Sequence, residues 1–138
     1  MTRRENLLRS CLFIGVLASL MMFASANITR AQDVLPCKCD TGTIYVGNVN
    51  CKFEICIKDA AGFICYTLGP GSVIPFKCHD QAVIFLTDCN GNLVQINNNK
   101  TNCVQCVCVA PGCCVDACVG YDANGCVYVK VGPSACKC

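Results

Sequence analysis

The sequence contains no tryptophan, one histidine and few charged residues, which make up 14% of its 138 positions. Without tryptophan the chain lacks the buried ring that packs against the inter-sheet disulfide of immunoglobulin domains. The one histidine, His79, stands between Cys78 and Asp80, and consecutive side chains point in different directions, so these three do not form a catalytic triad. Neither Ser72 nor Ser134 lies in a nucleophile-elbow pattern. We therefore expect no enzyme, no cofactor and no small-molecule substrate.

The chain also lacks long apolar runs, except for residues 11–23 near its start. This run follows a basic stretch and precedes Ala24-Ser25-Ala26, which is the layout of a signal peptide. It is shorter than the roughly 20 residues that a transmembrane helix needs. We expect residues 1–26 to be a signal peptide, with cleavage after Ala31 as the alternative, and no transmembrane segment after its removal. The pair Arg3-Arg4 suggests twin-arginine export, but Asn6 stands where a hydrophobic residue is wanted, which favours ordinary export.

The mature chain has no excess of charge of either sign. Removal of residues 1–26 leaves eight basic and eight acidic residues, and the basic ones are scattered singly from Arg30 to Lys137. A nucleic-acid binder needs a basic surface that neutralises phosphates, so this class of partner is excluded. A neutral surface gives little repulsion between copies and favours self-association. The expected partners are the chain itself or other extracellular proteins.

Cysteine, in contrast, is abundant. Cys11 lies in the signal peptide, and sixteen cysteines remain, a content typical of an exported disulfide scaffold. The spacing leaves their pairing open. In an extended strand both members of a C-x-C pair lie on one face, so we expect them to bridge to different partners and to clamp both termini. The sixteen are Cys37, Cys39, Cys51, Cys56, Cys65, Cys78, Cys89, Cys103, Cys106, Cys108, Cys113, Cys114, Cys118, Cys126, Cys136 and Cys138.

The later cysteines also suggest a metal site. Their C-x-x-C, C-x-C and C-C spacings resemble those of metallothionein clusters, although that resemblance is local. Thiolate sites need reduced cysteines, and export usually oxidises them. In addition, metallothionein-like clusters occur in chains that lack the hydrophobic strands of this sequence. We therefore favour disulfides over a thiolate metal site.

Short apolar stretches alternate with turn residues throughout the mature chain, which is typical of β-structure. Val127 to Val131 is the clearest case, because its three valines alternate with Tyr128 and Lys130. About seven strands are predicted: 43–46, 53–58, 64–68, 82–87, 93–96, 104–109 and 127–131. We expect an all-β, disulfide-rich two-layer sandwich or barrel built from short hairpins.

Three turns share the pattern Asp-x-x-Gly: Asp59 with Gly62, Asp88 with Gly91, and Asp122 with Gly125. The first and third are each followed by Gly-Pro at the same offset, so residues 51–78 and 114–136 form a candidate internal repeat. Each pattern predicts a hairpin whose glycine takes a positive φ. A calcium loop is the alternative, but an EF-hand has its glycine two positions later.

Residues 27–36 are expected to form a short extension and residues 37–138 a single domain. Asn99-Lys100-Thr101 matches a glycosylation sequon, and the four tyrosines are expected on solvent-side strand positions or on a binding face. The first hypothesis is a secreted structural or interaction protein of the cell surface or extracellular matrix that self-assembles. The second is a monomeric inhibitor or effector that displays a loop at 69–77 or 97–102, and the third is a metal-binding protein.

Overall fold

The computed structural model describes residues 34–98 and 100–138, which form strands, turns and loops but no helix. None of these residues therefore forms a helix long and apolar enough to cross a membrane. The expected signal peptide, both cleavage sites, Cys11, most of the extension and Asn99 lie outside the described residues. The strands are β1 (Leu35–Pro36), β2 (Thr41–Val46), β3 (Phe53–Asp59), β4 (Gly62–Leu68), β5 (Val73–Lys77), β6 (Gln81–Thr87), β7 (Leu93–Gln95), β8 (Cys103–Ala110), β9 (Cys113–Tyr121) and β10 (Val127–Pro133).

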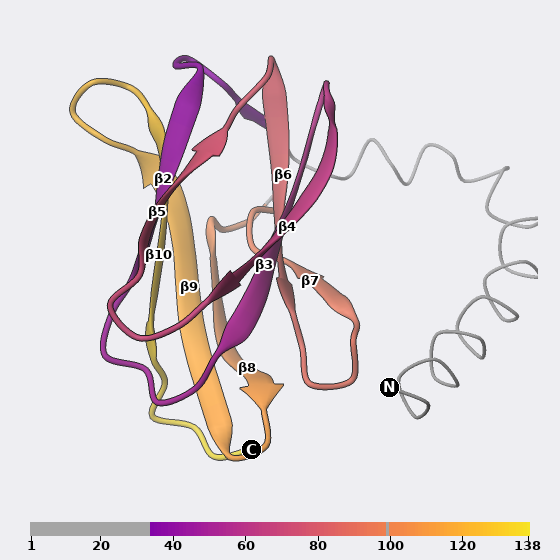
Figure 1. Cartoon of the computed structure of the whole chain (residues 1–138), viewed down its shortest axis with the longest axis vertical. Helices are drawn as coiled ribbons and strands as arrows, with labels where there is room; N and C mark the ends of the chain where they lie inside the picture. The colour runs from indigo at the N-terminus through magenta and orange to yellow at the C-terminus, as the bar shows by residue number, and fades with distance from the viewer. Residues whose placement is uncertain (1–33, 99) are drawn as a thin grey trace, which may run out of the picture.

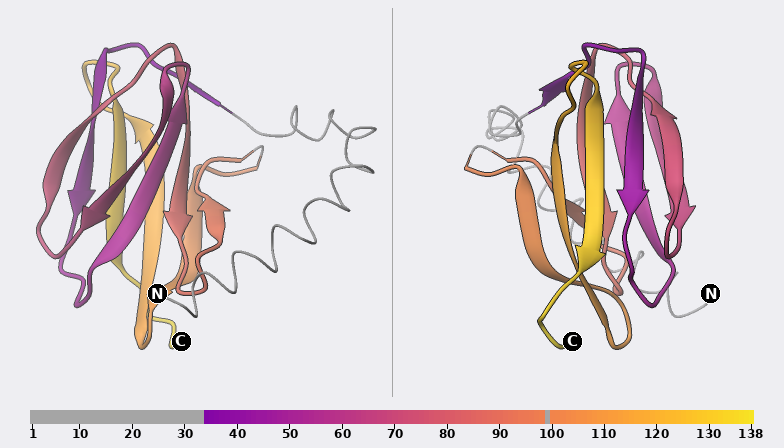
Figure 2. Two further views of the ribbon diagram at one scale, coloured as in Figure 1. Left: turned by 45° about the vertical axis from the view of Figure 1, so that its right-hand side comes forward. Right: turned by 90° about the vertical axis from the view of Figure 1, so that its left-hand side faces the viewer.

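The strands form two five-stranded sheets that face each other, as the predicted sandwich requires (Figures 1 and 2). The first sheet has the order β1-β6-β3-β4, and β7 also pairs with β6. The second sheet has the order β5-β2-β10-β9-β8. Within it β10 runs parallel to β2 and antiparallel to β9. All strand pairs of the first sheet are antiparallel.

The core lies between the sheets and consists largely of β-branched side chains. Ile55 and Ile84 of the first sheet and Ile44 and Val129 of the second are each 0% exposed. Because successive side chains of a strand point to opposite faces, the alternation in β10 buries its valines while Lys130 stays exposed. Burial of each such side chain stabilises the fold by roughly 1.5–3 kcal/mol.

The predicted number of strands was too low. All seven predicted strands are present, and β1, β5 and β9 are additional. Strand β5 lies in the segment 69–77 that was expected to be a display loop, and it contains Pro75, a residue without an N–H that is tolerated because β5 is the edge of its sheet. In β9 the buried positions are Cys113, Val115, Ala117 and Val119, and this alternation of small residues and cysteines is a weak sequence signal.

The three Asp-x-x-Gly segments are the turns of three hairpins, β3–β4, β6–β7 and β9–β10. Gly62, Gly91 and Gly125 have φ values of 155°, 86° and 80°, positive as predicted. The hairpins of the candidate repeat lie in different sheets, since β3–β4 belongs to the first and β9–β10 to the second.

Gly42 gives a direct test of how tightly the second sheet is packed. A Cβ at this position would overlap the ring of Phe76 on β5 and lie 2.6 Å from the carbonyl oxygen of Val127, whereas a Cβ at Gly132 would have no neighbour within 4 Å. Overpacking of this kind costs about 1–3 kcal/mol. We expect Gly42→Ala to lower the free energy of unfolding, measured by denaturant titration, by that amount, and Gly132→Ala to leave it nearly unchanged. Equal effects of the two substitutions would contradict the packing described here.

Candidate functional site

In six disulfides each cysteine has a single partner, and the two partners lie between 9 and 87 positions apart in the sequence. Both cysteines of the first C-x-C pair bridge to different partners, as expected. The bridges are Cys37–Cys78, Cys39–Cys126, Cys51–Cys113, Cys56–Cys65, Cys103–Cys118 and Cys106–Cys136.

Some of these bridges join neighbouring strands of one sheet, and others join the two sheets. Cys56–Cys65 and Cys103–Cys118 each join residues that lie directly opposite each other on neighbouring strands, with Cα atoms 4.0 Å apart. Cys51–Cys113 instead ties the segment before β3 in the first sheet to the start of β9 in the second. The first kind fixes strand register, and the second kind holds the sheets together.

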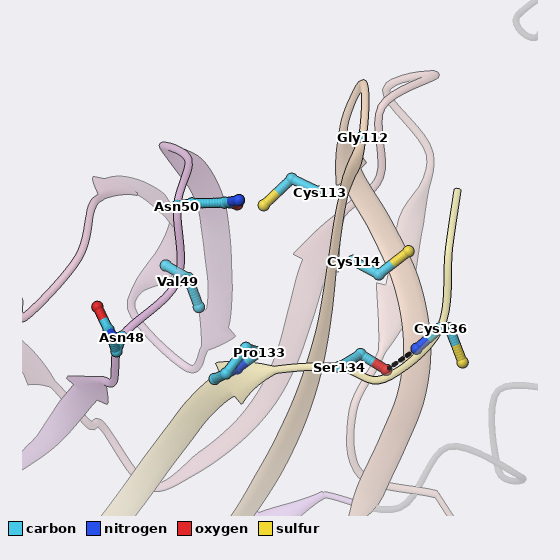
Figure 3. Close-up of a pocket in the computed structure, with 9 residues that line it drawn as sticks. All are labelled: Asn48, Val49, Asn50, Gly112, Cys113, Cys114, Pro133, Ser134 and Cys136. Carbon is cyan, nitrogen blue, oxygen red and sulfur yellow. Dashed lines mark hydrogen bonds between the residues drawn. The ribbon is translucent and has the colours of Figure 1, made fainter.

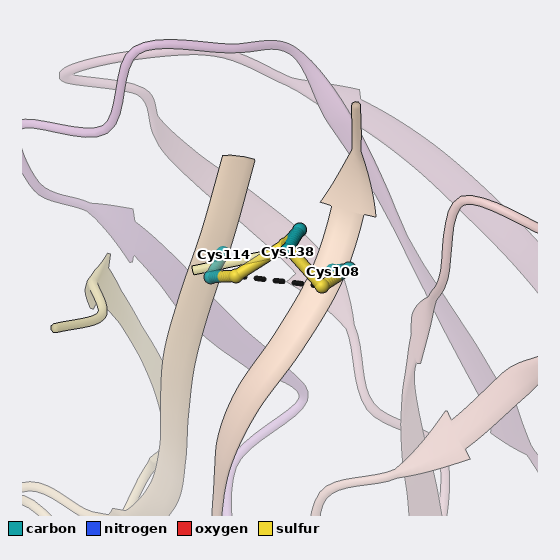
Figure 4. A group of neighbouring side chains, drawn as sticks. All are labelled: Cys108, Cys114 and Cys138. Carbon is teal, nitrogen blue, oxygen red and sulfur yellow. Dashed lines mark hydrogen bonds between the residues drawn. A yellow bond between two sulfur atoms is a disulfide. The ribbon is translucent and has the colours of Figure 1, made fainter. Parts of the chain in front are cut away.

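Four cysteines remain outside these six bridges, and three of them form a cluster. Cys138 lies within disulfide range of both Cys108 and Cys114, and the Sγ atoms of Cys108 and Cys114 lie 3.4 Å apart (Figure 4). A sulfur atom holds one disulfide at a time, so seven of the eight pairings in the structure can coexist. Cys89 is free and exposed. The eight bridges that an even number of cysteines allows are therefore not all formed.

Bridging removes most of the thiolates that the metal hypothesis needs. Cys103, Cys106, Cys113 and Cys118 are all disulfide-bonded. Among the described residues, the groups of possible ligands are Cys108 with Cys114 and Cys138, and Glu54 with the bridged pair Cys56 and Cys65. Either group would present all of its cysteines as thiolates only after its disulfide is reduced.

A small polar pocket of about 170 Å³ lies beside this cluster. Asn48 to Asn50, between β2 and β3, face the β8–β9 turn at Gly112 and the C-terminal segment at Ser134 (Figure 3). The Ser134 hydroxyl accepts a hydrogen bond from the backbone N–H of Cys136 at 3.3 Å. Ligand sites for drug-sized molecules span about 300–1,000 Å³, so this pocket is too small for such a ligand.

The carboxylates of the three turn aspartates act as backbone caps. Oδ1 of Asp88 accepts N–H groups of residues 90 and 92, and Oδ1 of Asp122 accepts those of residues 124 and 126, all at 2.8–2.9 Å. Asp59 instead accepts the N–H groups of Ala61 and Gly62. This engagement supports the turn interpretation over the calcium one, because these oxygens already have donors.

Asp59 has a second contact that sequence spacing did not reveal. Its Oδ2 lies 2.7 Å from Nδ1 of His79 and accepts the backbone N–H of His79 at 3.0 Å. Desolvation raises the pKa of Asp59, but the hydrogen bonds from His79, Ala61 and Gly62 together outweigh it, so the pKa is lowered below its usual value. His79 lies in the connection between β5 and β6 and links it to the β3–β4 turn.

Of the two segments expected to be display loops, 69–77 and 97–102, only the second is a loop. Residues 73–77 form β5, so the display loop at 69–77 is wrong. The segment 97–102 is a loop in its described residues, in which Asn98 Oδ1 accepts the backbone N–H groups of Lys100 and Thr101. Of the tyrosines, Tyr121 donates its hydroxyl to the carbonyl of Pro36 at 2.7 Å, which fastens the start of the described chain to the second sheet.

Strand β4 is the least protected edge among the described strands. Proteins normally protect edges by shortness, charge, proline or bulges. Strands β1 and β7 are short, β5 contains Pro75 and Lys77, and β8 has register shifts at Val104/Val107 and Cys108/Ala110. By contrast, β4 is seven residues long, pairs regularly with β3, and contains neither proline nor charge. Phe63 and Ile64, on its two faces, are 50% and 52% exposed.

Comparison with known proteins gives no relative: no family model, no curated protein and no solved structure matches the chain. The class of protein is therefore defined by its own structure, as a small all-β sandwich stabilised by dense disulfides, which is typical of secreted and extracellular proteins.

The Asp59 contacts predict a pH dependence of stability. Because the pKa of Asp59 is lower in the folded state than in the unfolded chain, its contribution is fully present above the unfolded value near 3.8 and is lost as the pH falls through the folded value. We expect Asp59→Asn to lower the free energy of unfolding by about 1 kcal/mol at neutral pH and to flatten its decline below pH 4. Asp40→Asn, at an exposed position, is the control. Identical acid unfolding curves for the wild type and Asp59→Asn would contradict this.

The two kinds of bridge should differ in their effect on stability. Cys51–Cys113 closes 62 residues and Cys56–Cys65 closes 9. In the chain-entropy account, removal of one bridge then costs about 4 and about 2.5 kcal/mol, respectively. We expect the double variant Cys51→Ala/Cys113→Ala to have a lower midpoint of thermal unfolding than Cys56→Ala/Cys65→Ala. The reverse order would show that strand register, and not closure between the sheets, dominates.

Proposed function

We propose that this chain is an extracellular structural or interaction protein that self-associates through the open edge of β4. The observation that carries the proposal is that β4 is long, regular, uncharged and apolar on both faces, with no strand on its outer side among the described residues. Such an edge offers unpaired N–H and C=O groups to another strand. The proposal assigns no catalytic role.

The disulfides support an extracellular location. Bridges at this density persist in oxidising surroundings and are rare in reducing ones. They also make an exposed edge tolerable, because Cys56–Cys65 fastens β4 to β3 at the middle of the strand. The edge then remains a strand when it is unpaired and needs little further ordering to pair.

A second copy of the chain is the partner that fits this edge best. Two β4 strands related by a twofold axis pair antiparallel, and with the axis at Cys65, Phe63 of each copy lies opposite Thr67 of the other. On the opposite face of the sheet, Ile64 then lies opposite Tyr66. Because β4 carries no charge, this pairing brings no like charges together. Cross-strand pairs between aromatic and β-branched residues each contribute roughly 0.2–1 kcal/mol.

The second candidate function is a monomeric binding module in which β4 accepts a strand from a different protein. This mode, known as β-augmentation, uses the same backbone groups. The two candidates differ in the state of the isolated protein, because only self-association makes its mass depend on its own concentration.

Replacement of Ile64 tests the role of β4. We expect the wild type to be dimeric at high concentration in sedimentation equilibrium, and Ile64→Lys to raise the dissociation constant at least tenfold, because a charge on an edge strand opposes pairing. Val73→Lys is the matched control, since Val73 is 63% exposed on β5, the edge that already contains Pro75.

A strictly monomeric wild type at high concentration would overturn self-association and leave the monomeric binding module. Equal weakening by Ile64→Lys and Val73→Lys would show that association does not use β4. Circular dichroism of both variants checks that each remains folded.

A further inference from the structure

The C-terminal cysteine cluster has a geometry that none of the other bridges shares. Cys138 is within disulfide range of two partners, with Cα–Cα separations of 5.7 Å to Cys108 and 6.1 Å to Cys114. Both separations lie within the 4.4–6.8 Å that disulfides usually span. Cys108 and Cys114 also lie directly opposite each other on β8 and β9.

A disulfide between Cys108 and Cys114 is also geometrically possible. Cys56–Cys65 and Cys103–Cys118 show that cysteines directly opposite on neighbouring strands of this fold do form disulfides. Cys108 and Cys114 hold the same relation, and their Sγ atoms are 3.4 Å apart. Three sulfur atoms thus compete for one bridge, and one of them is left as a thiol in contact with it.

We propose that Cys108, Cys114 and Cys138 form a thiol–disulfide exchange site, in which one bridge moves among three sulfur atoms. The remaining thiol is the reactive group of the site, and the ligand class that it accepts is a disulfide or another thiol-reactive compound. This inference does not depend on self-association through β4.

The exchange step needs neither an oxidant nor a reductant. Starting from Cys108–Cys138, the thiol of Cys114 loses its proton to solvent, and the thiolate attacks the sulfur of Cys138. The Cys114–Cys138 bond forms as the Cys108–Cys138 bond breaks, and the electron pair leaves on Cys108, which takes a proton from solvent. One disulfide and one thiol are present before and after the step.

The position of the cluster suits such exchange. Cys138 is exposed, and Cys108 and Cys114 lie on the outer face of the second sheet, because Val107, Val109, Cys113 and Val115 point into the core. The bridge can move without disturbing the buried side chains. The free Cys89 lies next to the cluster, since its backbone N–H donates to the carbonyl of Cys108 at 2.8 Å.

The test uses a Cys89→Ser variant, so that the cluster supplies the remaining thiol. The folded protein is labelled with N-ethylmaleimide at mildly acidic pH, then unfolded, reduced and labelled with a second reagent, and the maleimide is located by fragmentation mass spectrometry. In parallel, disulfide isomers are separated by reversed-phase chromatography at acidic pH, where thiolates are protonated and exchange stops. Each isomer is then returned to neutral pH.

We expect the maleimide on at least two of the three cysteines, and we expect each isolated isomer to return to the starting mixture. A Cys89→Ser/Cys138→Ser variant, which has only two cluster sulfurs, should give no interconverting isomers. A label confined to one cysteine, or isomers that persist at neutral pH, would overturn the proposal. Labelling of all three with release of a bound metal would overturn it in favour of a thiolate metal site.

Discussion

The sandwich depends on covalent cross-links between two thin sheets. Its core consists largely of Ile and Val side chains from both sheets, and small domains bury only a modest fraction of their surface. Cys51–Cys113 fixes the sheets to each other, and Cys37–Cys78 fixes the start of the described chain to the connection between β5 and β6. The apolar alternation then determines which faces are buried, and the bridges limit how far the unfolded chain can expand.

The hairpins add local order to this framework. Each Asp-x-x-Gly turn caps its own backbone N–H groups with one carboxylate, which fixes the turn that joins the two neighbouring strands. Asp59 makes an additional contact, because its other carboxylate oxygen contacts His79 and so links the β3–β4 turn to the β5–β6 connection. Local turns and long-range bridges therefore act on the same strands.

Much of this arrangement could be predicted from the sequence, and the features that could not be predicted have physical causes. The period-two alternation of β3 and β10 and the turns at Asp59, Asp88 and Asp122 are local signals. The proline in β5 is tolerated only because β5 lies at an edge, and edge position is a property of the sheet. The cysteine pairing, the Asp59–His79 contact and the three-sulfur cluster depend on strand order, which the residue pattern alone does not determine.

The most direct test of the central claim is the far-ultraviolet circular dichroism of the protein after reduction and alkylation under native conditions. If covalent cross-links between the sheets hold the fold, the β-sheet spectrum of the oxidised protein should be lost. A reduced, alkylated chain that keeps this spectrum and still unfolds cooperatively on heating would contradict the claim, because the core alone would then be sufficient.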